Sequence, residues 1–121
     1  MKLLIVEDDR FILDVLVKRF KLENFEVYTS ENGKKALGII KKNAPDLILL
    51  DLVLPVMDGI TFLEKIRKID EYKNIPVIIL TNLSDAQTIA DCKKRGVNDY
   101  LIKTDWKIDE VVDRVKKELN I

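Results

Sequence analysis

The chain contains no histidine and only one cysteine, Cys92, among its 121 residues. A lone cysteine cannot form an intrachain disulfide, which favours a reducing compartment, and we interpret Cys92 as a small buried hydrophobic side chain. Without histidine or a second thiol, the chain also lacks the ligands that zinc prefers. Glycine is scarce, with 4 residues, and neither type of glycine-rich loop that cradles nucleotide phosphates is present. The composition therefore argues against zinc sites and nucleotide-binding loops.

An excess of one charge and long apolar runs are also missing. The 21 Lys and Arg residues balance 21 Asp and Glu residues, so no overall field draws the protein toward nucleic acid or anionic lipid. No apolar run approaches the roughly 18 residues of a membrane span, and no signal-peptide pattern is present. With 47% hydrophobic residues, the chain can bury a core of its own. We expect one cytoplasmic domain over residues 1–121, with no direct nucleic-acid binding and no membrane association.

Short apolar segments alternate five times with segments of helical period. Apolar residues fill the first, third and fourth short segments almost completely, as in parallel strands that are covered on both faces. We predict strands at residues 2–7, 25–29, 46–50, 76–80 and 98–102. Strands that alternate with helices over short connections imply right-handed crossovers, so the prediction is an α/β fold with a doubly wound, five-stranded parallel sheet, (βα)5.

The intervening segments carry apolar stripes with the spacing of amphipathic helices. Ser84 with Asp85 is expected to cap the fourth helix, and Thr104 or Asp105 the fifth. We expect the following five stripes to face the core: Phe11, Ile12, Val15, Leu16 and Phe20; Ala36, Leu37 and Ile40; Ile60, Leu63 and Ile66, with Ile69 as a further candidate; Ala86, Ile89, Ala90 and Cys92; and Ile108, Val111, Val112, Val115 and Leu119.

Polar side chains stand at the ends of four predicted strands. Glu7 and Asp8 follow the apolar run Leu3–Val6 of the first strand, and Asp51 follows the third strand. Thr81 follows the fourth strand and Lys103 the fifth. In open α/β sheets, ligands bind outside the carboxyl ends of the strands, at the point where the strand order reverses. We therefore expect these five residues to form one polar site at one edge of the sheet.

The acidic members of this predicted site need a compensating positive charge. Glu7, Asp8 and Asp51 would repel one another at close range, so either some are protonated or a divalent cation neutralises them. A site made only of oxygen ligands suits Mg²⁺, and the carbonyl of Val53 can supply one more ligand. The alternative is that Glu7, Asp8 and Asp9 serve as capping and first-turn acids of the next helix, where the macrodipole favours them.

Asp51, Thr81 and Lys103 together fit phosphoryl chemistry. A carboxylate can accept a phosphoryl group, and the transfer then depends mostly on positioning and charge neutralisation. Lys103 offers a point charge for phosphate, and Thr81 offers a hydroxyl for a phosphoryl oxygen. Taken singly, the lysine also fits a solvent-facing strand end and the threonine a turn. A phosphatase of the haloacid dehalogenase type would need a second aspartate two residues after the first, where this chain has Val53.

This pattern resembles the receiver domain of two-component response regulators over essentially the whole chain. Each match alone is weak, but together they stand in register on the expected alternating architecture. The resemblance implies the flavodoxin-like strand order 2-1-3-4-5. The matching residues are Glu7, Asp8 and Asp9, Asp51, Pro55 and Gly59 in the loop after it, Thr81, Tyr100 and Lys103.

The resemblance also implies a chemical role for each acidic residue. Asp51 would accept a phosphoryl group from the phosphohistidine of a sensor histidine kinase or a phosphotransfer protein. Mg²⁺ would be held by Asp8, Asp51 and the Val53 carbonyl, with Glu7 acting through a water molecule. The domain would catalyse only its own phosphoryl transfer and a slow autodephosphorylation, so we do not expect an enzyme.

A conformational switch is the second implication of the resemblance. Phosphorylation would draw Thr81 toward the phosphate and turn Tyr100 inward, which reshapes the face made by the fourth helix, the fifth strand and the fifth helix. A downstream protein target or a fused output domain would respond to that face. The alternative is a receiver-like interaction module that works without phosphorylation.

The sequence departs from the family pattern at several positions near the site. Thr104 stands where proline is usual, so a cis X-Pro bond cannot form there. Asn82 stands where a small residue is usual and would crowd the preceding threonine. Val53 and Leu83 provide no polar group to position a hydrolytic water, so we predict a long-lived phosphoryl group. Trp106 is interpreted as a packing anchor for the last helix whose fluorescence responds to Mg²⁺.

Overall fold

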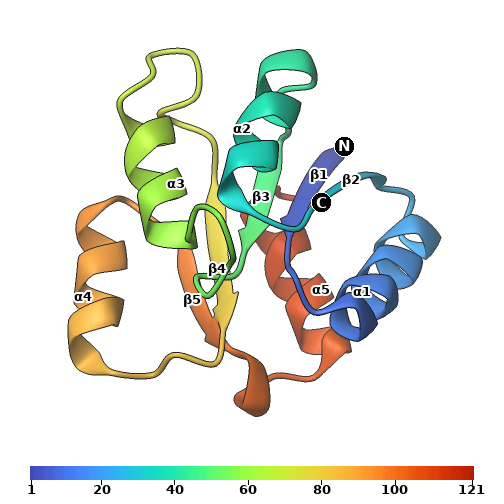
Figure 1. Cartoon of the computed structure of the whole chain (residues 1–121). Coiled ribbons are helices and arrows are strands. Elements are labelled where there is room, and N and C mark those ends of the chain that lie inside the picture. The colour runs from blue at the N-terminus through green and yellow to red at the C-terminus, as the bar shows by residue number, and fades with distance from the viewer.

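The computed structural model describes all 121 residues and contains five strands that alternate with five helices, plus one short 3₁₀ helix, η1 (Figure 1). Every predicted strand is present, with ends within one residue of those predicted. No helix has the length and apolar character needed to span a bilayer. The elements are β1 (Lys2–Val6), α1 (Arg10–Leu22), β2 (Glu26–Ser30), α2 (Gly33–Lys42), β3 (Leu47–Leu50), α3 (Gly59–Arg67), β4 (Val77–Thr81), α4 (Ala86–Lys94), β5 (Asp99–Ile102), η1 (Lys103–Asp105) and α5 (Ile108–Glu118).

The five strands form one parallel sheet in the order β2-β1-β3-β4-β5. The chain runs from β1 to β2 on one side and then returns to place β3 on the other side of β1. The strand order therefore reverses between β1 and β3, and this is the place where open α/β sheets bind their ligands. The predicted fold class and strand order are both confirmed.

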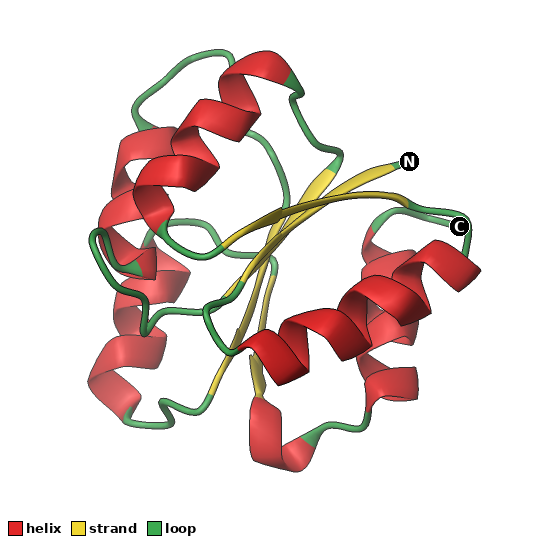
Figure 2. Cartoon of the chain, turned by 45° about the vertical axis from the view of Figure 1, so that its right-hand side comes forward, coloured by secondary structure: helices red, strands yellow, loops and turns green.

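Helices cover both faces of the sheet (Figure 2), and a separate apolar cluster lies on each face. Successive side chains of a strand point to opposite faces. Leu3 and Ile5 of β1 therefore join a core cluster with α1 and α5, while Leu4 and Val6 join a second cluster with α2, α3 and α4. Burial on both faces explains why the central strands are apolar at almost every position.

Helix α1 is rotated relative to the apolar stripe predicted for it. Leu13, Leu16 and Phe20 are buried, but Phe11 and Val15 are 78% and 40% exposed. The prediction that these two face the core is wrong. Each lies two positions from Leu13, which is about 200° around the helix axis, so both point away from the sheet when the leucine faces it.

Helix α4 contributes little to the core. Cys92 is fully buried, as predicted, but Ala86 and Ala90 are exposed, so the predicted stripe is only partly correct. Alanine carries little apolar area, and its exposure therefore costs little free energy. The predicted cap is present, because the Asp85 side chain accepts a hydrogen bond from the Thr88 N–H at 3.1 Å.

The start of α5 differs from the prediction. Thr104 and Asp105 lie in η1 and do not cap the helix. Lys107 precedes the first helical turn, and its N–H donates to the Glu110 carboxylate at 2.9 Å. The 3₁₀ turn moves the helix start three residues beyond Asp105. Trp106, between the two elements, packs against the cluster beneath α1 and α5, as predicted.

Candidate functional site

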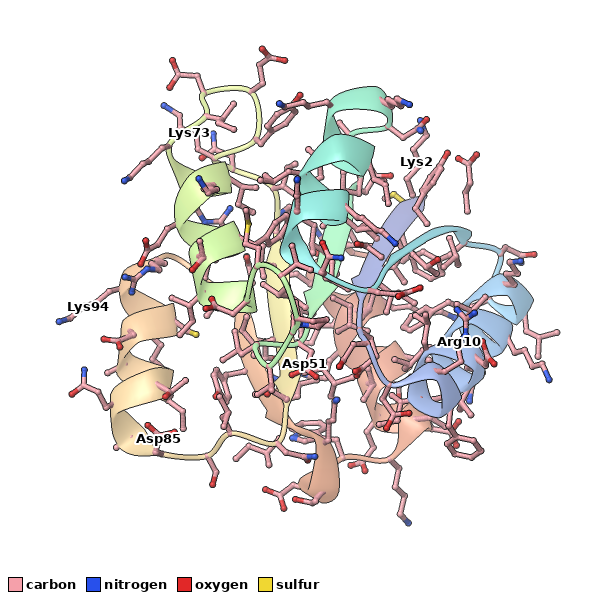
Figure 3. The ribbon with its side chains drawn as sticks, in the orientation of Figure 1. Lys2, Arg10, Asp51, Lys73, Asp85 and Lys94 are labelled. Atoms are coloured by element: carbon pink, nitrogen blue, oxygen red, sulfur yellow. The ribbon has the colours of Figure 1, made fainter.

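The strand ladders continue one residue past β1 and β3 and so fix where the acidic residues begin. The Asp51 N–H donates to the Val6 carbonyl at 3.0 Å, and the Glu7 N–H donates to the Ser30 carbonyl at 2.9 Å. Figure 3 shows Asp51 at the end of the sheet opposite Lys2, which begins β1. Both carboxylates therefore leave the backbone at the carboxyl edge, where the strand order reverses.

Lys103 joins these two acidic residues. Its Nζ atom lies 2.6 Å from Glu7 Oε1 and 2.8 Å from Asp51 Oδ2. Glu7 is 2% exposed and Asp51 is 5% exposed. Charge-assisted hydrogen bonds of this length are strong when water is excluded. The structure thus brings together the ends of β1, β3 and β5, as the sequence predicts.

Asp8 completes an acidic cluster at the rim. One carboxylate oxygen from each of Glu7, Asp8 and Asp51 lies within 4.8 Å of the others, and the Asp8 side chain is exposed. The other Glu7 oxygen accepts a hydrogen bond from the Asp9 N–H at 3.1 Å. Asp51 Oδ1 accepts one from the Leu52 N–H at 2.7 Å. Each buried carboxylate therefore keeps a fixed orientation.

The helix-capping alternative holds for one acidic residue only. Asp9 is the N-cap of α1, and its side chain accepts a hydrogen bond from the Ile12 N–H at 3.2 Å. Glu7 and Asp8 precede the cap and belong to the cluster instead. Capping therefore explains Asp9 but leaves the other two acidic residues to the site.

Burial dominates the electrostatics of the cluster. It raises the pKa of Glu7, and the charge of Asp51 adds to the rise, while hydrogen bonds from Lys103 and from the Asp9 N–H oppose it. Burial alone would lower the pKa of Lys103, but its hydrogen bonds and charge attraction to Asp51 and Glu7 outweigh burial and raise that pKa. The ammonium therefore stays charged, and three acidic residues face a single cation.

This donor set fits a hard divalent cation. All the candidate ligand atoms are carboxylate oxygens, and the chain has no histidine and no cysteine in the cluster. Oxygen ligands of this kind suit Mg²⁺, which binds through one or two carboxylates and keeps several water molecules. Val53 follows Asp51 by two positions and is 58% exposed; its carbonyl as a ligand stays a prediction.

A single loop residue, Leu83, links Thr81 to Tyr100. Thr81 is fully buried, and its Oγ1 atom receives only a long contact of 3.4 Å from the Leu83 N–H. The Tyr100 hydroxyl donates to the Leu83 carbonyl at 2.7 Å. Burial raises the pKa of Tyr100 to about 12, so the phenol keeps its proton at neutral pH. The movements predicted for Thr81 and Tyr100 stay predictions.

Comparison with known proteins shows which family the chain belongs to. The sequence model of one family, the response regulator receiver domain, matches residues 3–116. The chain belongs to this family. The receiver domain is 41% identical over 118 residues to sporulation initiation phosphotransferase F of Bacillus subtilis, a match that covers 98% of this chain and 93% of that protein. Members of this family are phosphoacceptor domains of two-component signalling.

Two further relatives show how the receiver domain occurs elsewhere. Transcriptional regulatory protein KdpE of Staphylococcus aureus is 36% identical over 115 residues, which cover 95% of this chain but 48% of the relative. The receiver domain thus spans about half the length of that regulator. The crystal structure of the CheX–CheY–BeF3–Mg²⁺ complex from Borrelia burgdorferi contains a chain with a TM-score of 0.89 and 31% identity, covering 98% of this chain and 89% of that one.

The loop after Asp51 folds back tightly onto the backbone of the receiver domain. Val56 has a φ of 67°, and the Met57 N–H donates to the Pro55 carbonyl at 2.7 Å, which closes a three-residue γ-turn around a β-branched residue. A Cβ atom on Gly59 would lie 2.3 Å from the Asp51 carbonyl oxygen. The sequence identifies Gly59 as a motif position, but no local signal reveals this close approach.

An apolar groove beside Lys103 is a second feature that the sequence prediction missed. It has a volume of about 180 Å³ between α1, η1 and α5, and 8 of its 9 lining residues are hydrophobic. Phe11 and Val15 form its exposed wall, and Trp106 and Ile108 line the side of α5. The receiver domain therefore carries an exposed apolar surface that extends to the edge of the acidic cluster.

Proposed function

We propose that residues 1–121 form one receiver domain, which acts in the cytoplasm as a phosphorylation-dependent switch. Asp51 accepts a phosphoryl group from the phosphohistidine of a sensor histidine kinase or a phosphotransfer protein. The main support is the contact of Lys103 with Asp51 Oδ2 at 2.8 Å, inside an acidic cluster at the switch point of the sheet. Membership of the receiver family supports the same reaction class.

In the transfer, the P–N bond of the phosphohistidine breaks while a P–O bond to Asp51 forms. The leaving imidazole keeps the electron pair of the broken bond and takes its proton from solvent. Asp51 attacks as a carboxylate and needs no general base. The Leu52 N–H fixes one carboxylate oxygen and Lys103 holds the other, so the acceptor is oriented before the donor arrives.

Mg²⁺ completes the charge balance of the proposed reaction. Asp8, Asp51 and the carbonyl of Val53 would hold it, and Glu7 would contact it through a water molecule. Bound there, the ion would neutralise charge on the phosphoryl oxygens. Lys103 supplies a second, permanent positive charge, 2.8 Å from Asp51 Oδ2.

The phosphoryl group then changes the output face. Thr81, whose hydroxyl has only one long contact, donates a hydrogen bond to a phosphoryl oxygen. The loop that carries Leu83 moves with it, and Tyr100 turns inward. Contacts that favour one arrangement shift the population of α4, β5 and α5 toward that arrangement. A downstream protein or a fused output domain binds the altered face.

The groove next to Lys103 is the proposed docking surface for the phosphoryl donor. A donor protein must bring its phosphohistidine to Asp51, and the exposed side chains of Phe11 and Val15 line the same groove as Lys103, which contacts Asp51. A donor protein that covers these two side chains removes apolar surface from water, which stabilises the contact by roughly 25 cal/mol per Å². We expect Phe11→Ala to slow transfer from a histidine kinase while acetyl phosphate still modifies Asp51 at the wild-type rate. Equal slowing with both donors would place Phe11 outside the docking surface.

Binding of beryllofluoride, a phosphoryl mimic, separates the switch from the alternative of a phosphorylation-independent interaction module. With Mg²⁺ present, fluorine NMR should show a bound trifluoroberyllate signal for the wild type and none for Asp51→Asn. A wild type that binds no beryllofluoride would favour the interaction module. A signal that persists in Asp51→Asn would remove Asp51 as the acceptor.

A further inference from the structure

A basic cleft lies at the carboxyl-terminal ends of α3 and α4, away from Asp51. It has a volume of about 860 Å³, and five of its ten lining residues are cationic whereas one, Glu64, is acidic, in a chain of zero net charge. Figure 3 shows Lys73 and Lys94 extending into solvent on one side of the molecule, well separated from Asp51. The cationic lining residues are Arg67, Lys68, Lys73, Lys94 and Arg95.

Arg67 ties together the two loops that border this cleft. Its guanidinium donates to the carbonyls of Arg95 at 2.8 Å, Ile75 at 2.9 Å, Lys73 at 3.1 Å and Gly96 at 3.2 Å. None of these partners carries a negative charge. Burial lowers the pKa of Arg67. The cleft therefore contains a partly desolvated cation whose charge no carboxylate of the protein neutralises.

The remaining cations are only partly compensated. Arg95 pairs with Glu64 at 2.5 Å, and Lys73 lies 3.5 Å from an exposed aspartate carboxylate. Lys68 and Lys94 are exposed and have no ion-pair partner. Basic residues in the last turn of a helix also interact favourably with its dipole. The helix dipole therefore explains why Arg67 and Lys94 are each basic, but it does not explain why five cationic residues surround one cleft.

The chemistry of the cleft selects among anionic ligands. None of its lining residues is aromatic, so it offers no surface for stacking a nucleotide base. Backbone carbonyls of its lining residues accept hydrogen bonds from Arg67, and the cleft lies at the carboxyl-terminal ends of α3 and α4, whereas compact phosphate sites use N–H groups at helix amino termini. Long, flexible lysines around a polar, open depression suit several carboxylates spaced along a chain. We propose that this cleft binds an acidic segment of a partner protein.

This proposal is independent of phosphoryl transfer at Asp51 and is tested on the full chain. A capped, fluorescently labelled oligoglutamate peptide is titrated at low ionic strength, with binding followed by fluorescence anisotropy. The cleft variant is Lys68→Glu with Lys94→Glu. The matched control is Lys18→Glu with Lys117→Glu, two exposed lysines on α1 and α5 outside this cleft. Both variants change the net charge equally, so they differ only in where the charge is reversed.

We expect the wild type to bind the peptide with a strongly salt-dependent affinity, the cleft variant to bind about tenfold more weakly and the control to bind as the wild type does. Circular dichroism checks that both variants are folded. An equal loss of peptide affinity in the cleft variant and the control variant, or no peptide binding by the wild type, would overturn the proposal. Tighter binding of a single-stranded oligonucleotide than of the peptide at the same ionic strength would overturn it as well.

Discussion

The ionised form of Glu7 carries a free-energy cost in the acidic cluster, so Glu7→Gln should stabilise the fold at neutral pH. Burial, assisted by the charge of Asp51, raises the pKa of Glu7 above its ordinary value of 4.5. A group that binds its proton more tightly in the folded state stabilises the fold below the unfolded pKa. That contribution is lost as the pH rises through the folded pKa. The variant lacks this titration, so its advantage appears above pH 4.5 and is absent below it.

The expected gain in the free energy of unfolding for Glu7→Gln follows from three opposing effects. Lys103 at 2.6 Å attracts the Glu7 carboxylate by about 6 kcal/mol at an effective dielectric constant of about 20. Asp51, with an oxygen within 4.8 Å, repels it by at least about 3.5 kcal/mol on the same scale. Removing the Glu7 carboxylate from water costs several kcal/mol. This cost exceeds the net attraction that is left when the repulsion by Asp51 is subtracted from the attraction by Lys103. The glutamine can still accept a hydrogen bond from Lys103, so we expect a gain of about 1 kcal/mol, or about 4 °C in Tm for a chain of this length.

Urea unfolding of both proteins at about pH 4 and about pH 7.5 measures this difference. Glu71→Gln is the matched control, because Glu71 is exposed and forms no ion pair, and it should stay within about 0.5 kcal/mol of the wild type. Added Mg²⁺ should stabilise the wild type and narrow the gap, since it neutralises the same charges. A Glu7→Gln variant that is less stable than the wild type at pH 7.5, or a difference that does not change with pH, would refute the reasoning.

Three further predictions concern the surroundings of the site. Gly59→Ala places a carbon 2.3 Å from the Asp51 carbonyl oxygen, so we expect urea unfolding to show a loss of at least about 2 kcal/mol, whereas Gly38→Ala, with nothing within 4 Å, should gain up to about 1 kcal/mol. Equal stabilities of these two variants would contradict the close approach. Leu83→Asn should shorten the lifetime of the phosphorylated protein, followed by mass spectrometry over time; fast loss in the wild type, unchanged by the substitution, would count against a long-lived phosphoryl group. Trp106 lines the groove that reaches the cluster, and its fluorescence should change at millimolar Mg²⁺, so the absence of a response would weaken the metal site.

The sequence predicts those features of the fold that depend on burial of whole segments. Central strands covered on both faces must be apolar at almost every position, so their runs are unambiguous and their ends are found within one residue. The polar cluster is predictable for a related reason. A carboxylate such as Asp51 or an ammonium such as Lys103 directly after such a strand lies at a sheet edge shared by all the parallel strands. The topology thus places both groups at the same edge, where their side chains are 2.8 Å apart.

Features that depend on rotation or on backbone proximity are not readable from sequence. Phe11 and Val15 fit a helical stripe as well as Leu13 does, and only packing against the sheet selects the residues that face inward. Their exposure creates the groove beside the site, which the stripe prediction would have buried. The positive φ of Val56 is likewise invisible, because its β-branched side chain disfavours that conformation and no local pattern indicates it.

Intact-mass spectrometry after incubation with acetyl phosphate and Mg²⁺ tests the proposed phosphoryl acceptor most directly. The wild type should gain the mass of one phosphoryl group, the gain should require Mg²⁺, and Asp51→Asn should gain nothing. An unmodified wild type, or an Asp51→Asn variant modified to the same extent, would contradict phosphorylation of Asp51.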